Sequence, residues 1–99
     1  MAYTPVTEFE WDDAKGEACF LERGFDFEYA ALAFSDPNRR AMPDTRRAYG
    51  EDRFQLTGQI DGRVFVVVYT PRARRVRIIS ARKANAREVL NYESHAQGD

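Results

Sequence analysis

Alternating polar and apolar residues are clearest in the second half of the chain. Residues 53–60 read Arg53-Phe-Gln-Leu-Thr-Gly-Gln-Ile60 and alternate without a break, which is typical of a strand with one buried face. Asp61-Gly62 is a favoured two-residue hairpin turn, and residues 63–70 are apolar on both faces, which predicts a second, central strand. A turn over 71–74 then leads to a third strand over 75–81 and a closing helix from 84 to about 92.

The pattern in the first half is mostly helical. Residues 7–11 alternate and predict a short strand, and Asp12 and Gly24 are placed to begin and end a helix over 13–23. Asp26 is placed to cap a second helix, in which apolar residues repeat at i, i+3, i+4 and i+7 until Asp36-Pro37 ends it. The polar segment 37–51 predicts a loop with room for one short strand around residues 40–42.

The hairpin turn also predicts which side chains share a face of the sheet. It places Leu56 opposite Val67 and Arg53 opposite Thr70. Helices are then expected to cover the face that holds Phe54, Leu56, Ile60, Phe65, Val67, Tyr69, Val76 and Ile78. On the open face we expect Arg53, Arg75 and Arg77, with Arg82 and Lys83 where the last strand enters the helix.

These elements predict one α+β domain over residues 1–99. We expect an antiparallel sheet of three to four strands, with two N-terminal helices and one C-terminal helix packed on one face. The structured core is expected over about residues 7–93, and the polar segment 94–99 is expected to be a frayed tail in which His95 has no role.

Composition excludes several classes of protein. The fractions of 31% charged and 43% hydrophobic residues are ordinary for a soluble globular domain. The longest apolar run, residues 64–69, is too short to span a bilayer, and no secretory signal is visible, so we expect a cytoplasmic protein without a membrane partner. The single Cys19 excludes an internal disulfide, and one Cys with one His cannot form an ordinary zinc site, so no metal or cofactor is expected.

The formal net charge of −1 hides a division along the chain. Residues 1–38 carry nine acidic and two basic residues, whereas residues 39–99 carry thirteen basic and seven acidic ones. Residues 72–87 alone hold seven basic residues and no acidic one. This asymmetry indicates an anionic partner for part of the surface. The alternative is that the charges solvate a small domain and pair across it.

Arginines gathered on an open sheet face favour nucleic acid, because guanidinium groups bind phosphates. The sequence contains no helix-turn-helix, zinc finger or glycine-rich phosphate loop. What remains for catalysis is metal-free attack of an RNA 2′-hydroxyl on its own 3′-phosphate, with arginines stabilising the developing charge. Glu88 and Tyr92, one helical turn apart, could then transfer protons. From the residues alone, a passive anion- or protein-binding surface is favoured over this nuclease.

Several motifs together resemble the BrnT-type toxins over about residues 8–93. They are Phe9-Glu-Trp-Asp-x-x-Lys15, Gly24 with Phe27-Glu28, Tyr49-Gly-Glu-Asp-Arg-Phe54, Arg63-Val-Phe-Val-Val-Val-Tyr-Thr70, and Arg77-Ile-Ile-Ser-Ala-Arg-Lys-Ala84 followed by Glu88 and Tyr92. The resemblance implies a ribonuclease toxin of a bacterial type II toxin–antitoxin system with a RelE-like fold. It also implies a BrnA-type antitoxin with a ribbon-helix-helix DNA-binding part, and contact with operator DNA only through the complex of the two proteins.

With this resemblance, the residues expected to carry function fall into two groups. The catalytic candidates are Arg53, Arg77, Arg82, Glu88 and Tyr92, and the RNA-binding candidates are Lys15, Arg75 and Lys83. Their structural alternatives are arginines paired with Glu51, Asp52 or Glu88, a solvated Lys15, and a Tyr92 packed on the core. Family members usually have histidine where this chain has Arg23, whose guanidinium stays protonated and cannot act as a base. A non-catalytic protein- or nucleic-acid-binding module therefore remains the alternative function.

Overall fold

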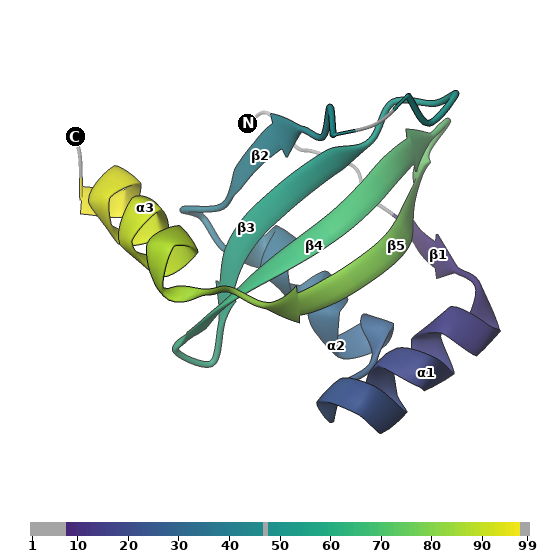
Figure 1. Ribbon diagram of the computed structural model, residues 1–99, viewed down its shortest axis with the longest axis horizontal. Coiled ribbons are helices and arrows are strands. Elements are labelled where there is room, and N and C mark those ends of the chain that lie inside the picture. Colours follow the sequence, from purple (N-terminus) through teal and green to yellow (C-terminus); the bar gives the residue numbers. More distant parts are fainter. Residues whose placement is uncertain (1–7, 47, 98–99) are drawn as a thin grey trace, which may run out of the picture.

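The computed structural model describes residues 8–46 and 48–97, which form a sheet with helices around it (Figure 1). Along the chain the elements are β1 (Glu8–Trp11), α1 (Asp13–Arg23), α2 (Phe27–Ala30), the 3₁₀ helix η1 (Ala31–Ser35), β2 (Arg40–Pro43), β3 (Phe54–Ile60), β4 (Arg63–Arg72), β5 (Arg75–Lys83) and α3 (Ala86–Gln97). The expected core begins at Thr7, and the expected tail ends with Gly98 and Asp99. These three residues lie outside the described ones. No described helix is both long and apolar enough to cross a membrane.

The sheet has five strands in the order β1-β5-β4-β3-β2. Neighbouring strands are antiparallel except β1 and β5, which are parallel. The α+β class is confirmed, whereas the expectation of a purely antiparallel sheet of three to four strands is wrong. The two short strands expected near residues 7–11 and 40–42 are β1 and β2, and they form the two edges of the sheet. The first of them is parallel because the chain leaves β1 through the helices before it enters the hairpins.

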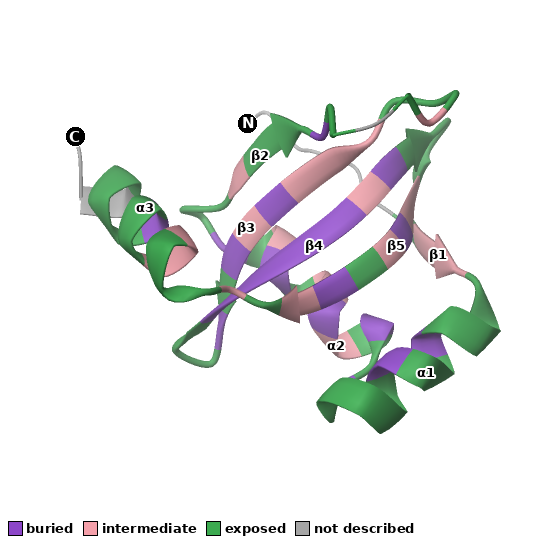
Figure 2. Cartoon of the chain, in the orientation of Figure 1, coloured by how far each residue is buried: buried purple, intermediate pink, exposed green. Residues whose placement is uncertain are grey.

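The N-terminal helices cover one face of the sheet and form the core with it. Asp12 and Asp26 accept hydrogen bonds from the backbone N–H groups of Lys15 and Tyr29, at 3.1 and 2.9 Å, and so begin α1 and α2 as the sequence predicts. Gly24 ends α1 in the left-handed region at φ 85°. The second helix is only four residues long and continues as η1. Buried side chains line β4 over most of its length (Figure 2), and the core cluster consists of Cys19, Phe25, Phe27, Ala30, Ala33, Leu56, Ile60, Phe65, Val67, Ile78 and Ala81.

The C-terminal helix α3 does not join this layer. It lies beside β3 at the end of the sheet, away from α1 (Figure 1), so the expectation that all three helices pack on one face is wrong. Leu90 is 67% exposed and Tyr92 is the one buried side chain among residues 86–95, so the helix contributes little to the core. Asn85 and Glu88 exchange hydrogen bonds of 2.8 Å that cap its first turn, two residues later than the expected start. The helix continues to Gln97, through part of the segment expected to be frayed.

The register of the first hairpin is confirmed, whereas the second hairpin differs in two ways. Leu56 lies opposite Val67, and Ile60 opposite Arg63. The second turn has only residues 73–74, so Arg77 lies opposite Thr70 instead of Val68, which leaves each side chain on its expected face. A β-bulge then follows, in which β5 has one residue more than β4, namely Ile79.

We expect Gly58→Ala to destabilise the fold, because η1 approaches β3 closely at this glycine. A Cβ at residue 58 would lie 2.6 Å from the carbonyl oxygen of Ala33, which is backbone and cannot move aside cheaply. The free energy of unfolding, measured by urea denaturation, should fall by about 1–3 kcal/mol. The exposed neighbour offers a control, since Gln59→Ala should stay within about 0.5 kcal/mol of the wild type. Equal midpoints for the two variants would contradict the tight packing of η1 on β3.

Candidate nucleic-acid interface

The side of the sheet opposite α1, α2 and η1 is crossed by no described helix and carries most of the arginines in the strands. Side chains paired across a sheet point to the same face. One row across the sheet is Arg40, Thr57, Val66 and Arg82, the next is Met42, Gln55, Val68 and Ser80, and the third is Thr70, Arg77 and Glu10. Arg53, one residue before β3, extends the third row by the alternation of the strand. We call this surface, with Arg40, Arg53, Arg77 and Arg82, the arginine face.

The bulge at Ile79 decides which basic residues share this face. Arg77 and Arg82 are five positions apart, and simple alternation would place them on opposite faces. The extra residue brings both to the arginine face and sends Lys83 to the other, where it pairs with Phe65. The rows of Arg82 and Arg77 cross β4 at Val66 and Thr70, which are four positions apart, or roughly 13 Å along the strand.

Each of the three arginines expected to be catalytic has a carboxylate partner within the protein. The short strand β1, the loop before β3 and helix α3 each supply an acid, so the alternative that these charges pair within the domain is confirmed. Two of these pairs are the structural alternatives that the sequence offered. The pairs are Arg53–Glu51 at 3.3 Å, Arg77–Glu10 at 3.3 Å and Arg82–Glu88 at 2.8 Å. They hold Arg77 toward β1 and Arg82 toward α3, so the structure does not point the three guanidinium groups at one spot.

The Arg82–Glu88 pair has the best geometry. Two guanidinium nitrogens donate to the two carboxylate oxygens at 2.8 Å each, which is the bidentate arrangement. The hydrogen bond to Glu88 raises the pKa of Arg82, against the nearby positive charge of Arg46, and the same bond lowers the pKa of Glu88. Glu88 is thus a weak base whose oxygens hold an arginine and cap α3. The Arg82 side chain nevertheless remains 40% exposed.

The loop between β2 and β3 adds a further arginine that the sequence did not single out. The Asp44 carboxylate is fully buried and accepts two hydrogen bonds of 2.8 Å from Arg46, which are the main reason that its pKa is lowered to about 2. Tyr49 donates to the same carboxylate at 3.4 Å, and the Arg53 guanidinium lies 4.1 Å from the centre of the Tyr49 ring. Arg46 itself is 61% exposed. The polar composition of this segment predicts a loop. The pairing of residues 40–43 with β3 is what shows that the segment borders the arginine face.

The three residues expected to bind RNA are scattered. Arg75 lies at the end of the arginine face and forms ion pairs with Glu8 and Glu10, both at 3.3 Å. Lys15 is exposed in the first turn of α1, on the helix side of the sheet. Lys83 also lies on that side, as the bulge requires. The structure therefore brings only Arg75 to the arginines.

Tyr92 is buried, and its hydroxyl is used inside the protein. It donates to Asp36 at 2.5 Å, and Asp36 also accepts from the backbone N–H groups of Gln59 at 2.7 Å and Asn38 at 2.9 Å. Burial, with the hydrogen bond to Asp36, raises the pKa of Tyr92 to about 12. Burial alone would raise the pKa of Asp36, but these hydrogen bonds lower it. Tyr92 thus attaches α3 to the sheet, while Glu88, one turn earlier, reaches Arg82.

Comparison with known proteins gives one family. The family model described as "Ribonuclease toxin, BrnT, of type II toxin-antitoxin system" matches residues 11–88. This range includes every strand from β2 to β5 and all the arginines of the arginine face. No curated protein matches the chain.

We expect Tyr92→Phe to lower the stability of the fold and to change its dependence on pH at the alkaline end. Because the pKa of Tyr92 is raised in the folded state, its contribution is complete below the ordinary tyrosine pKa of about 10 and is lost as the pH rises to about 12. At pH 7 the variant should lose about 1–3 kcal/mol, since Asp36 stays buried without this donor. Urea denaturation from pH 7 to 11.5 checks this, because the gap between the two proteins should narrow above pH 10. A difference in the free energy of unfolding that stays constant over this pH range would contradict the link between Tyr92 ionisation and stability.

Proposed function

The chain belongs to the BrnT family of ribonuclease toxins of type II toxin–antitoxin systems, and from this we propose that it cleaves RNA at the arginine face without a metal ion. The observation that carries the proposal is the set of arginines that β2, β5 and the residue before β3 place on the side of the sheet opposite α1 and α2. Such a surface binds the phosphates of a single strand and can stabilise the charge that develops during their cleavage.

In the proposed reaction the ribose 2′-oxygen attacks the adjacent phosphorus. The bond between O2′ and phosphorus forms, the bond between phosphorus and O5′ breaks, and the products are a 2′,3′-cyclic phosphate and a 5′-hydroxyl. The 2′-hydroxyl loses its proton and the leaving oxygen gains one. Negative charge grows on the non-bridging oxygens in the transition state, and arginines placed there lower the barrier.

The internal ion pairs are compatible with this role. A guanidinium group has five N–H donors, and a bidentate pair uses two of them. Arg77 and Arg82 are 32% and 40% exposed, so donors remain on the solvent side. We assign Arg82 to the phosphate at the cleavage site, and Arg77, Arg53, Arg40, Arg46 and Arg75 to the neighbouring backbone. Glu88 is the positioning residue that holds Arg82, and Tyr92 holds the helix that carries Glu88.

None of the candidates for proton transfer is well suited to it. The pKa of Glu88 is lowered, the Tyr92 hydroxyl is engaged by Asp36, and Arg23 stands where the resemblance implies a histidine. We therefore propose that water carries the protons and that charge stabilisation supplies most of the catalysis. The rate should be modest, since a well-placed general base usually contributes 10²- to 10⁴-fold.

The partner in this proposal is a BrnA-type antitoxin with a ribbon-helix-helix DNA-binding part, in the cytoplasm. It would neutralise the toxin by covering the arginine face with acidic or apolar groups, and operator DNA would be bound through the complex. The alternative is a non-catalytic RNA- or protein-binding module. The ion pairs favour that alternative, because they stabilise the arginines without any substrate.

Arg82→Ala should abolish most of the activity while the fold is kept. In EDTA, the wild-type protein should cut labelled RNA and leave 2′,3′-cyclic phosphate ends, and the variant should be slower by about 10²- to 10³-fold. Arg74→Ala, in the turn at the far end of the β4–β5 hairpin, is the matched control and should stay within about twofold. Retardation of RNA on a gel without cleavage by the wild type would support the binding module instead.

Glu88→Gln distinguishes a positioning role from that of a general base. The amide keeps a neutral hydrogen bond to Arg82 but loses the charge, so we expect a decrease of about tenfold in kcat/KM. If Glu88 only positions Arg82, the slope of the pH–rate profile between pH 5 and 8 should be the same in both proteins. A profile that becomes flat in the variant would assign proton abstraction to Glu88.

A further inference from the structure

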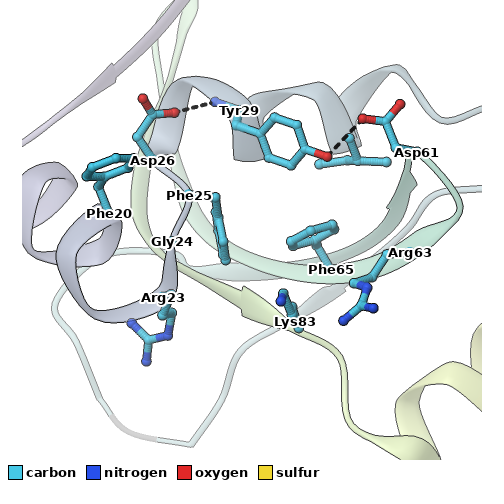
Figure 3. A pocket seen from close by; sticks show the side chains of 11 residues that line it. Phe20, Arg23, Gly24, Phe25, Asp26, Tyr29, Asp61, Arg63, Phe65 and Lys83 are labelled. Atoms are coloured by element: carbon cyan, nitrogen blue, oxygen red, sulfur yellow. Dashed lines mark hydrogen bonds between the residues drawn. The ribbon is translucent and has the colours of Figure 1, made fainter.

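A second candidate ligand site lies on the other side of the sheet, where the end of α1 and the start of α2 face the β3–β4 turn (Figure 3). The cavity measures about 540 Å³, which is within the usual range of small-ligand sites. Its lining includes three aromatic and three cationic side chains: Phe20, Phe25, Phe65, Arg23, Arg63 and Lys83. None of these is used by the proposed cleavage.

The charges around this cavity are not balanced within the described part of the protein. Asp61 accepts a hydrogen bond from the Tyr29 hydroxyl and Asp26 one from the Tyr29 backbone N–H, both at 2.9 Å. The lining thus holds three cationic side chains against two carboxylates. Among the described residues, Arg63 and Lys83 have no ion-pair partner. The third cation, Arg23, has only its neighbour Glu22, at 3.9 Å. The three cationic side chains lie along one side of the cavity (Figure 3), which suits an anionic group.

The apolar part of the cavity suits an aromatic ring. Phe25 and Phe65 pack edge to face with their centres 5.1 Å apart and form a rigid floor. Phe20 also lines the cavity and is 54% exposed, so its ring is accessible to a ligand. An exposed ring next to unpaired cations matches a base and its phosphate, because every base can stack on an aromatic side chain.

The cavity is also continuous with the arginine face. Lys83 follows Arg82 directly, and the pleat of β5 turns the two side chains to opposite sides of the sheet. Strand β1 pairs only with residues 75–78 of β5. It therefore leaves the edge of β5 free at Arg82 and Lys83. A single strand bound at Arg82 can therefore pass around the sheet to Lys83.

We propose that this cavity binds one nucleotide of the RNA substrate, beside the segment held on the arginine face. Its base stacks on Phe20, and its phosphate binds Arg63 and Lys83. The inference rests on the proposed ribonuclease function and adds a subsite that would hold the RNA beside the cleavage site.

Titration of the ¹⁵N-labelled full-length protein with guanosine monophosphate tests the subsite directly. We expect chemical-shift changes at the backbone amides of Phe25, Asp61 and Lys83, and much weaker changes with inorganic phosphate. Phe20→Ala should weaken nucleotide binding about tenfold by loss of stacking. Arg63→Ala should have a similar effect by loss of a charged hydrogen bond. Arg74→Ala, far from the cavity, should leave the affinity unchanged.

Other results would overturn the inference. Equal binding of phosphate and nucleotide, or an intact affinity in Phe20→Ala, would leave a plain anion site. Absence of shifts with the nucleotide, together with loss of antitoxin binding in Phe20→Ala, would make the cavity a protein-docking surface. The titration needs no cleavage, so a wild type that fails to cut RNA would count against the proposed function and not against nucleotide binding. Where cleavage occurs, unchanged KM and cut positions in Phe20→Ala would also contradict the subsite.

Discussion

The one-residue bulge at Ile79 is the constraint on which the surface chemistry depends. Before it, Arg77 points to the open side and Ile78 to the core, and after it Arg82 points to the open side and Ala81 to the core. Without the extra residue, either Arg82 or Arg77 would be forced under the helices, where an unpaired charge is costly. The bulge thus lets β5 keep two buried residues and two exposed arginines on the correct sides.

The ion pairs explain how a fold tolerates so many arginines on one surface. The acidic first part of the chain supplies β1, whose parallel pairing with β5 sets Glu8 and Glu10 beside Arg75 and Arg77. Much of the charge division along the sequence is therefore resolved inside the molecule. RNA phosphates would have to add to these pairs or displace the carboxylates, which predisposes the surface to salt-sensitive binding. The Arg82–Glu88 pair joins β5 to α3, so the geometry at Arg82 depends on the attachment of that helix.

The sequence predicted the parts of the fold that local chemistry determines. Asp12, Asp26 and Gly24 mark helix ends, and Asp61-Gly62 fixes the register of β3 and β4 correctly. The parallel partner of β1, the placement of α3 and the bulge depend on contacts distant in sequence, and no local pattern reports these. The doubled isoleucine at 78–79 is the one local sign of the bulge, because it breaks the alternation of β5. The expected strand also ended at residue 81, whereas β5 continues to Lys83 and its alternation turns Lys83 away from Arg82.

Unpaired charge is a sharper guide to ligands in this protein than total charge. The arginines that the sequence favoured most, Arg53, Arg77 and Arg82, are the ones that the fold neutralises with its own carboxylates. Arg63 and Lys83 attracted less notice, yet among the described residues no carboxylate pairs with them, and they line a cavity together with an exposed aromatic ring. A cation without an internal partner can bind an external anion without first giving up a carboxylate. Its position therefore says more about what the protein binds than the larger cluster does.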